Sequence, residues 1–280
     1  MRKTGGRGFE SLRAHMKFGI PLWYGNFRSA GFKQAIQEAK KTGCDYVEIS
    51  LDYPVKPQAS GIEIAFHAPW AGIETASPFK EIREAAFQVL FESMELASAL
   101  SPAYYNIHII AHDPTYHFPE VRKRIKKHAE AAGRRIERKA RSLGMRVTIE
   151  NNPSVFMGTI QDFGFLLKSR LRLCLDIGHV MIANWLLDKP YSLDEWIKRF
   201  GKKILTVHFH DCKFLERPYD HLMLGKGDLD LKRIAEDISR TNCEYLLLET
   251  IHKLRIREAV SYKDFKAGLK ICRKIFGPVV

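Results

Sequence analysis

Short β-rich runs alternate with helical stretches along most of this chain of 280 residues, and this alternation limits the fold more than any other feature. Eight runs have the length and composition of strands: Lys17–Ile20, Asp45–Leu51, Glu63–His67, Tyr104–Ile110, Met145–Glu150, Leu171–Asp176, Ile204–His208 and Tyr245–Glu249. Hydrophobic residues have helical spacing over Ser29–Thr42, Phe79–Leu100, Pro119–Leu143, Leu193–Phe200, Leu231–Arg240 and Tyr262–Phe276. Eight β/α alternations in this length predict an α/β fold, a single closed (β/α)₈ TIM barrel.

Residues 16–280 show no low-complexity linker and no break in composition, so we expect them to form one barrel domain. The connection between the second and third strands contains Pro57 and Gly61 and is too short for a full crossover helix. We therefore expect one outer helix of the barrel to be reduced there. Residues 1–15 are basic and lack an apolar core, which predicts an N-terminal extension rather than a secretory signal.

The composition excludes several classes of protein. With 45% hydrophobic and 28% charged residues, the chain is neither disordered nor fibrous. No apolar run approaches the roughly 20 residues that cross a bilayer, so we expect no membrane partner. The five cysteines have no C-x-x-C spacing, which disfavours a disulfide framework and a thiolate zinc site. This usage predicts a reducing, cytoplasmic compartment.

The net charge of +13 suggests a nucleic-acid partner, but much of this charge lies in one segment. Arg122–Arg141 contains ten Lys or Arg against only two Glu. Hydrophobic residues recur within it at three- and four-residue steps, which predicts a helix with a solvated basic face on the outer wall of the barrel. A charge run of this kind does not by itself indicate nucleic-acid binding.

Carboxylates, imidazoles and amides lie at the ends of most predicted strands. They occur in the segments H-A-P-W (67–70), N-I-H (106–108), I-E-N (149–151), L-D-I-G-H (175–179), H-F-H-D (208–211) and L-E-T (248–250). The active groups of a TIM barrel come from this end of the strands, and such groups are costly to bury without a partner. A shared divalent cation is the natural partner, because carboxylates and neutral imidazoles together suit zinc, manganese, cobalt or iron.

Several residues near these ends allow two interpretations. Glu48 lies within its strand and either supports the site or bonds a neighbouring group. His208 and His210 share a face of their strand, so either could be the metal ligand. Trp70 either stacks on a sugar or base or closes the mouth of the barrel. The long loop Asp211–Asp228 is expected to close over a ligand.

These motifs, in this order from residue 17 onward, resemble the xylose isomerase-like barrel superfamily, which includes endonuclease IV and the sugar isomerases and epimerases. In the epimerase-like members, four residues hold one divalent ion, and they carry over to Glu150, Asp176, His208 and Glu249. The resemblance implies that the two glutamates transfer protons and that His179 and Arg217 contact the substrate. Trp70 and His67 are further candidates for substrate contacts.

Endonuclease IV holds three zinc ions, and the resemblance to it implies a larger set of ligands: His67, His108, Glu150, Asp176, His179, His208, His221 and Glu249. One ligand of that pattern has no counterpart here. The aspartate two residues before the loop histidine falls on Tyr219, and Asp220 is one position away. Because a neutral phenol is a poor substitute for a carboxylate, the third ion is expected to bind weakly.

Three functions follow from these residues. The one that the sequence favours is a sugar or sugar-phosphate isomerase or epimerase, which uses manganese, cobalt or zinc and moves protons with Glu150 and Glu249. The second is an endonuclease IV-like phosphodiesterase, which cleaves abasic DNA with a zinc cluster. The third is a metal-binding barrel without catalysis. The expected partner is a small sugar or polyol, or abasic DNA if the second function is correct. All three functions are compatible with a homodimer.

Overall fold

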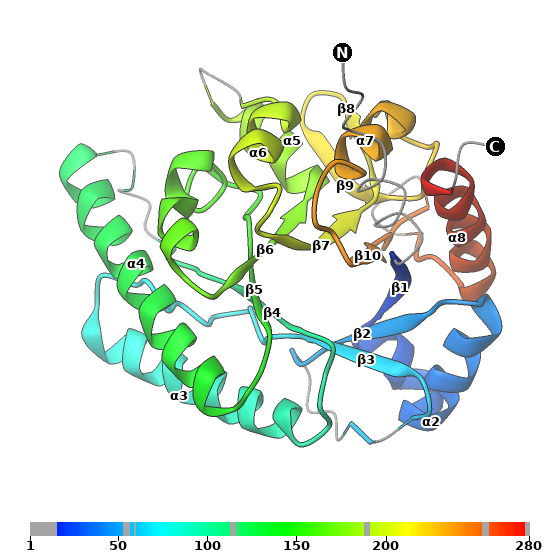
Figure 1. Ribbon diagram of the computed structural model, residues 1–280, viewed down its shortest axis with the longest axis horizontal. Helices are drawn as coiled ribbons and strands as arrows, with labels where there is room; N and C mark the ends of the chain where they lie inside the picture. Colours follow the sequence, from blue (N-terminus) through cyan, green and yellow to red (C-terminus); the bar gives the residue numbers. More distant parts are fainter. Residues whose placement is uncertain are drawn as a thin grey trace, which may run out of the picture.

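Eight parallel strands close into a barrel in the computed structural model, which describes residues 16–52, 57–58, 60–112, 116, 118–187, 191–253 and 258–277. In chain order the strands are β1 (Lys17–Leu22), β2 (Tyr46–Ser50), β3 (Glu63–His67), β4 (Tyr105–His108), β5 (Val147–Glu150), β6 (Arg172–Asp176), β7 (Ile204–Phe209) and β10 (Tyr245–Leu248). Each pairs with the next, and β10 closes on β1 (Figure 1). The predicted TIM barrel is confirmed, and the eight predicted strands overlap the observed ones.

Helices surround the barrel (Figure 1). They are α2 (Tyr24–Thr42), α3 (Lys80–Ser98), α4 (Pro119–Ser142), the 3₁₀ helix η1 (Ile160–Lys168), α5 (Ile177–Trp185), α6 (Leu193–Phe200), α7 (Leu231–Ile238) and α8 (Tyr262–Phe276). The six predicted helices overlap α2, α3, α4, α6, α7 and α8. The described residues between β2 and β3 contain no helix, in agreement with the reduction expected there.

Three features have no counterpart among the predicted elements: η1, α5, and a hairpin of β8 (Asp211–Phe214) and β9 (Pro218–Leu222). η1 takes the place of the outer helix after β5, and a capping box at its N-terminus is the sequence signal for it. α5 begins directly after β6, where Asp176 accepts a hydrogen bond of 2.6 Å from the backbone N–H of His179. The hairpin follows β7, so it lies at the end of the barrel where the polar strand ends meet.

Inside the barrel, one layer of side chains is apolar and lies at the amino ends of the strands, and the next layer is polar and lies at their carboxyl ends. Tyr46, Tyr104 and Tyr245 fill the amino end of the strands, and the ring centroids of Tyr46 and Tyr104 both lie 5.3 Å from that of Tyr245. A Cβ on Gly19 would come within 2.3 Å of the Tyr46 ring, so β1 has no room for a side chain there. Because side chains alternate along a strand, residues two or four positions further along also face inward. This periodicity gathers the polar strand ends in one layer.

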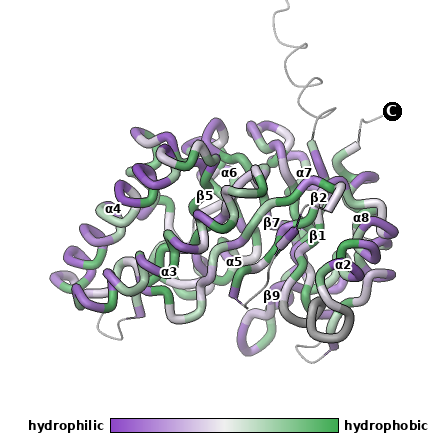
Figure 2. The backbone as a smooth tube through the Cα atoms, turned by 90° about the horizontal axis from the view of Figure 1, so that it is seen from below, coloured by the Kyte–Doolittle hydropathy of each residue, from purple (hydrophilic) through white to green (hydrophobic). Residues whose placement is uncertain are grey.

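The basic segment forms α4, as predicted. Its hydrophobic residues face the barrel, with Ile125, Ala129 and Ile136 buried. Hydrophilic residues recur along the length of the helix, which lies at one end of the molecule (Figure 2). The surplus of positive charge is therefore carried mainly by a solvated outer wall.

The expected basic extension, residues 1–15, lies outside the described residues and stays a prediction. One barrel accounts for the elements from Lys17 to Phe276 that the structure describes. None of the described helices is both long enough and apolar enough to cross a membrane.

Candidate metal centre

Glu150, Asp176, His208 and Glu249, the central group, meet at the carboxyl end of the barrel, with one ligand atom of each within 4.8 Å of the others. Strand register contributes to this, because Asp176 and His208 are partners in the β6–β7 pairing. Nδ1 of His208 lies 3.2 Å from Glu150 Oε1 and 3.0 Å from Glu249 Oε2. Neither ring nitrogen of His208 has a hydrogen-bond partner among the described residues, nor has Glu249 Oε2, although all three atoms are buried. A divalent cation would satisfy these atoms.

Two further histidines approach Glu150 from β3 and β4. Nε2 of His67 lies 3.5 Å from Glu150 Oε2, and Nε2 of His108 lies 3.3 Å from the same atom. His108 and Glu150 are partners in the β4–β5 pairing. These three residues, the His67 group, also present ligand atoms within 4.8 Å of one another. Because Glu150 belongs to both groups, its carboxylate is placed to bridge two ions.

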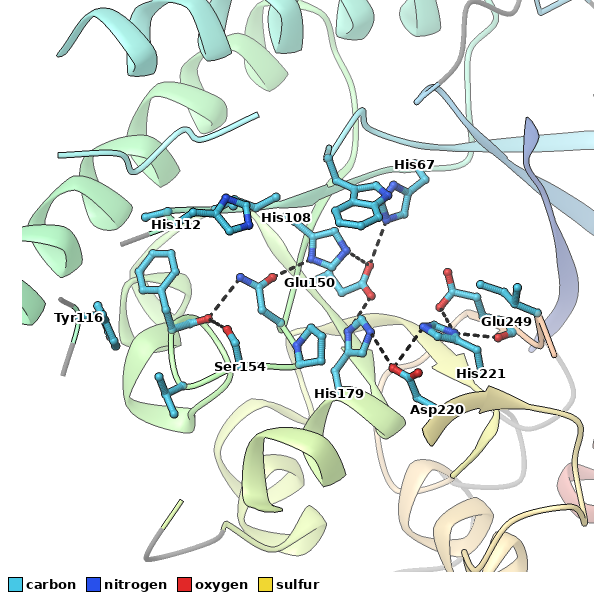
Figure 3. Close-up of a pocket in the computed structure, with 18 residues that line it drawn as sticks. His67, His108, His112, Tyr116, Glu150, Ser154, His179, Asp220, His221 and Glu249 are labelled. Carbon is cyan, nitrogen blue, oxygen red and sulfur yellow. Dashed lines mark hydrogen bonds and ion pairs between the residues drawn. The ribbon is translucent and has the colours of Figure 1, made fainter. Parts of the chain in front are cut away.

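His179, Asp220 and His221, the Asp220 group, come from α5 and the hairpin (Figure 3). Asp220 Oδ2 lies 4.0 Å from His179 Nε2 and 3.5 Å from His221 Nε2. Asp220, one sequence position away from the aspartate of the endonuclease IV pattern, therefore lies beside both histidines.

A bulge in the hairpin explains the position of Asp220. Asp211 pairs with Leu222 and Lys213 with Tyr219, so two residues of β9 stand opposite one residue of β8. His221 adopts a φ of 51° within this bulge. In a regular strand, consecutive side chains point to opposite faces, whereas the bulge turns Asp220 and His221 towards one centre.

Four of the histidines are held so that Nε2 faces the carboxylates. Nδ1 of each contacts a protein oxygen at 2.8–3.0 Å: the carbonyl of Ala68 for His67, Oδ1 of Asn152 for His108, the carbonyl of Asn151 for His179 and the carbonyl of Glu249 for His221. These oxygens can only accept, so Nδ1 carries the proton and Nε2 keeps a free lone pair. Histidines that bind metals are typically oriented in this way.

The geometry favours His208 over His210 as the metal ligand. Nδ1 of His210 accepts a hydrogen bond of 2.9 Å from the backbone N–H of His221, so its proton lies on Nε2, 3.1 Å from a carboxylate oxygen of Asp176. His210 therefore holds Asp176 in place. Oε2 of Glu48 lies 3.5 Å from Nε2 of His208 without a hydrogen bond, so Nδ1 is the ring nitrogen that faces the central group.

The centre has a large excess of negative charge. Five carboxylates meet there: Glu48, Glu150, Asp176, Asp220 and Glu249. Among the described residues that line the adjoining cavity there is no Lys or Arg. Burial alone would raise the pKa of Glu150, but the surrounding histidines outweigh it and hold this pKa well below its usual range. Burial alone would lower the pKa of His67, but the hydrogen bond and charge of Glu150 raise it to about 9. Bound divalent cations would neutralise the charge of these carboxylates, which protonated histidines would otherwise balance.

Two asparagines orient ligands, and the sequence patterns did not assign them this role. Asn106 Nδ2 donates to Oε2 of Glu150, and Asn152 Oδ1 accepts from His108. Asn152 also donates to two loop carbonyls, which fixes the orientation of its amide. The signal that could have revealed them is position, because both lie within two residues of a predicted ligand.

Asp211 anchors the loop that follows the hairpin. Its buried carboxylate accepts hydrogen bonds of 2.9–3.2 Å from the backbone N–H groups of Cys212, Gly225, Gly227 and Leu229. A carboxylate engaged by so many donors is a structural anchor rather than a metal ligand. Through it, the predicted closing loop is held against the barrel mouth, where Asp220 and His221 reach the centre.

A cavity of about 800 Å³ adjoins the metal centre (Figure 3). Three of the predicted substrate contacts, His67, Trp70 and His179, line it. Arg217 is not among the residues that line the cavity, and its contact with a substrate stays a prediction. Its exposed guanidinium lies over the ring of Tyr219, 5.2 Å from the ring centroid.

Comparison with known proteins agrees with this fold. The family model described as the xylose isomerase-like TIM barrel matches residues 36–270. The chain belongs to this family. A probable endonuclease 4 of Thermosipho melanesiensis is 22% identical over 214 residues, which cover 69% of this chain and 74% of that protein.

Two solved structures share this fold. A D-tagatose 3-epimerase-like protein matches with a TM-score of 0.70 at 18% identity, covering 93% of this chain and 97% of that one. The IolI protein with a bound zinc atom matches with a TM-score of 0.70 at 16% identity, covering 93% and 98%. At these identities the likeness establishes the barrel, and the function has to be argued from the site.

Proposed function

We propose that this family member hydrolyses phosphodiesters at a centre that holds three divalent ions, with zinc the ion that the ligands suit best. This is the endonuclease IV-like alternative, and one observation raises it above the isomerase. Asp220 joins His179 and His221, so the third group contains the anionic ligand that Tyr219 could not supply.

Charge balance supports three ions rather than one. With one divalent ion, the five carboxylates would leave a net charge of about −3, whereas three ions would bring it to about +1. A slightly positive centre attracts a phosphodiester anion, and a strongly negative one repels it. The cavity lining among the described residues offers no Lys or Arg that could take this role instead.

The residues of the chain have distinct tasks in this proposal. Glu150 joins the central group to the His67 group, and Asn106 fixes its carboxylate. His210 holds Asp176 in position, and Glu48 lies beside His208. Bound divalent ions supply Lewis acidity, which offsets the charge of the phosphate and makes water a competent nucleophile at neutral pH.

The test is metal analysis combined with an incision assay. We expect purified protein to hold about three zinc ions, to incise a duplex with a tetrahydrofuran abasic-site analogue, and to lose about one ion and most activity in Asp220→Ala. Tyr219→Phe is the matched control and should retain both. Incision that is absent from the zinc-loaded wild type would exclude the proposal.

A second candidate is the sugar isomerase or epimerase, because the central group alone is a complete set of ligands for one ion. In that case Glu150 and Glu249 would move protons beside a ketose. One ion per chain, together with exchange of a ketose C–H proton into deuterated water, would favour this candidate over the phosphodiesterase.

A further inference from the structure

The cavity has two halves of different chemistry. One half is the metal centre. The other half is the apolar wall, contributed by the loops after β3, β4 and β5: Trp70, Ile110, Tyr116, Val155 and Phe156. In Figure 3, Tyr116 and Ser154 lie on the side of the cavity away from Glu249, beyond His108. A substrate that reaches the metal centre therefore has room to place another part against the apolar wall.

Most of the polar side chains on this side are engaged, whereas the hydroxyl of Tyr116 is buried without a hydrogen-bond partner among the described residues. The amide of Asn152 is used by His108 and by two loop carbonyls. Ser154 Oγ donates to the carbonyl of Phe156 at 2.8 Å, and His112 Nδ1 lies 3.3 Å from Glu74 Oε1. A sugar bound here would bury hydroxyl groups with few partners, which costs free energy for each one. An apolar or aromatic group would not incur this cost.

The apolar wall also exposes large hydrophobic surface. Trp70 is 51% exposed and Val155 is 38% exposed. On the same wall Tyr116 and Phe156 are buried and packed edge to face, with ring centroids 5.3 Å apart. Exposed apolar side chains on a rigid backing inside a cavity are typical of a ligand subsite.

We infer that the substrate carries a planar aromatic group, about the size of a nucleobase, near the reacting phosphate, and that Trp70 and Val155 hold this ring. Only the phosphate in this inference rests on the proposed phosphodiesterase function. Binding of the aromatic ring can be measured without turnover. A cavity of about 800 Å³ is large for an abasic sugar alone, and it accommodates a sugar with its base.

The test compares phenyl phosphate with methyl phosphate as ligands of the zinc-loaded protein, measured by calorimetry. We expect phenyl phosphate to bind about tenfold more tightly, since a stacked ring contributes roughly that factor. Trp70→Ala and Val155→Asp should each remove most of this preference and leave methyl phosphate binding unchanged. Trp185→Ala and Val89→Asp should retain it, because these residues are 52% and 43% exposed but do not line the cavity.

Equal affinity for the two phosphates in the wild type would overturn the inference, as would a preference that survives in both variants of the apolar wall. Glucose 6-phosphate that binds as tightly as phenyl phosphate would also overturn it. If neither phosphate binds, the proposed function fails, and thymidine then tests the ring subsite alone. Quenching of tryptophan fluorescence by thymidine that is lost in Trp70→Ala would support the inference, and no quenching would contradict it.

Discussion

Nδ1 of His108 donates a hydrogen bond of 2.8 Å to Oδ1 of Asn152, which joins a metal-facing imidazole after β4 to the loop after β5. Asn152 is buried and donates in turn to the carbonyls of Ile109 and Phe156. The direction of His108 Nε2 is thus set by a residue outside the three ligand groups.

Asn152→Leu is expected to lower the affinity of the His67 group for zinc by about 10–100-fold, because His108 would lose the bond that fixes its tautomer. Competition with a chromophoric chelator measures this affinity. Ser154→Ala is the control, since it removes a hydrogen bond of the same loop without touching His108. Equal losses in the two variants would show that order in the loop, rather than the imidazole, sets the affinity.

Glu150→Gln should keep the fold and lower turnover by about 100-fold or more. A neutral amide has the shape of the carboxylate but lacks the negative charge that Glu150 contributes to both the central group and the His67 group. Metal analysis should show the loss of more than one ion. Of the three groups proposed to bind ions, only the central group contains Glu249, so Glu249→Gln should cost about one ion. If Glu150→Gln retained the metal content of the wild type, Glu150 would not be a bridging ligand.

Asp211→Ala should destabilise the protein by about 3 kcal/mol or more, because several backbone donors would lose the carboxylate that they share. Urea denaturation measures this loss, and limited proteolysis should cut first near Gly225–Gly227. Asp228→Asn is the control, since its carboxylate is exposed and should contribute much less. Similar stability of the two variants would contradict the anchoring role of Asp211.

The resemblance implied the central group, and strand periodicity explains why its members meet, because each lies at the end of a hydrophobic run of strand length. Parallel strands in a barrel bring such ends together, so Glu150, Asp176, His208 and Glu249 could be placed without knowledge of any loop. Glu48 lies inside its strand, and the period of two along β2 was enough to aim it inward.

Asp220 could not be placed in the same way, because its direction depends on the register between two short hairpin strands. That register is set by long-range pairing and by the bulge at His221, and neither is visible in the pattern of residue types. Residues on strand ends follow from periodicity, whereas residues on the hairpin require its geometry.

Gly178→Ala should weaken metal binding, although Gly178 is not a ligand. A Cβ at this position would come within 2.0 Å of His210 Cε1, so the buried ring that holds Asp176 would have to move. Chelator competition should show a loss of about tenfold or more. Gly164→Ala provides the control, because its Cβ would meet only a side-chain nitrogen of Arg199 at 3.9 Å. Unchanged affinity in Gly178→Ala would mean that His210 does not position Asp176.

Charge on the outer part of α4 is expected to matter little for the metal centre. Arg134 and Arg138 are exposed, and Arg134 lies 3.9 Å from Glu130 on the same helix. The double variant Arg134→Gln/Arg138→Gln should change stability by less than about 0.5 kcal/mol and leave zinc content and phenyl phosphate binding unchanged.

Arg135→Gln on the same helix is the informative contrast, because this guanidinium stacks on Phe87 with its carbon 3.8 Å from the ring centroid. It should cost about 1 kcal/mol in thermal denaturation without changing zinc content. Arg135 also donates to both carboxylate oxygens of Glu84, at 2.7 and 2.9 Å, so this variant loses packing and an ion pair, whereas the double variant removes solvated charge. Incision of a DNA duplex, measured over a series of salt concentrations, then tests whether the solvated face contributes. Contacts between basic side chains and DNA phosphates set how steeply DNA binding falls with salt concentration. If the double variant incised DNA less well and its incision depended less on salt, the basic face of α4 would be part of the DNA-binding surface.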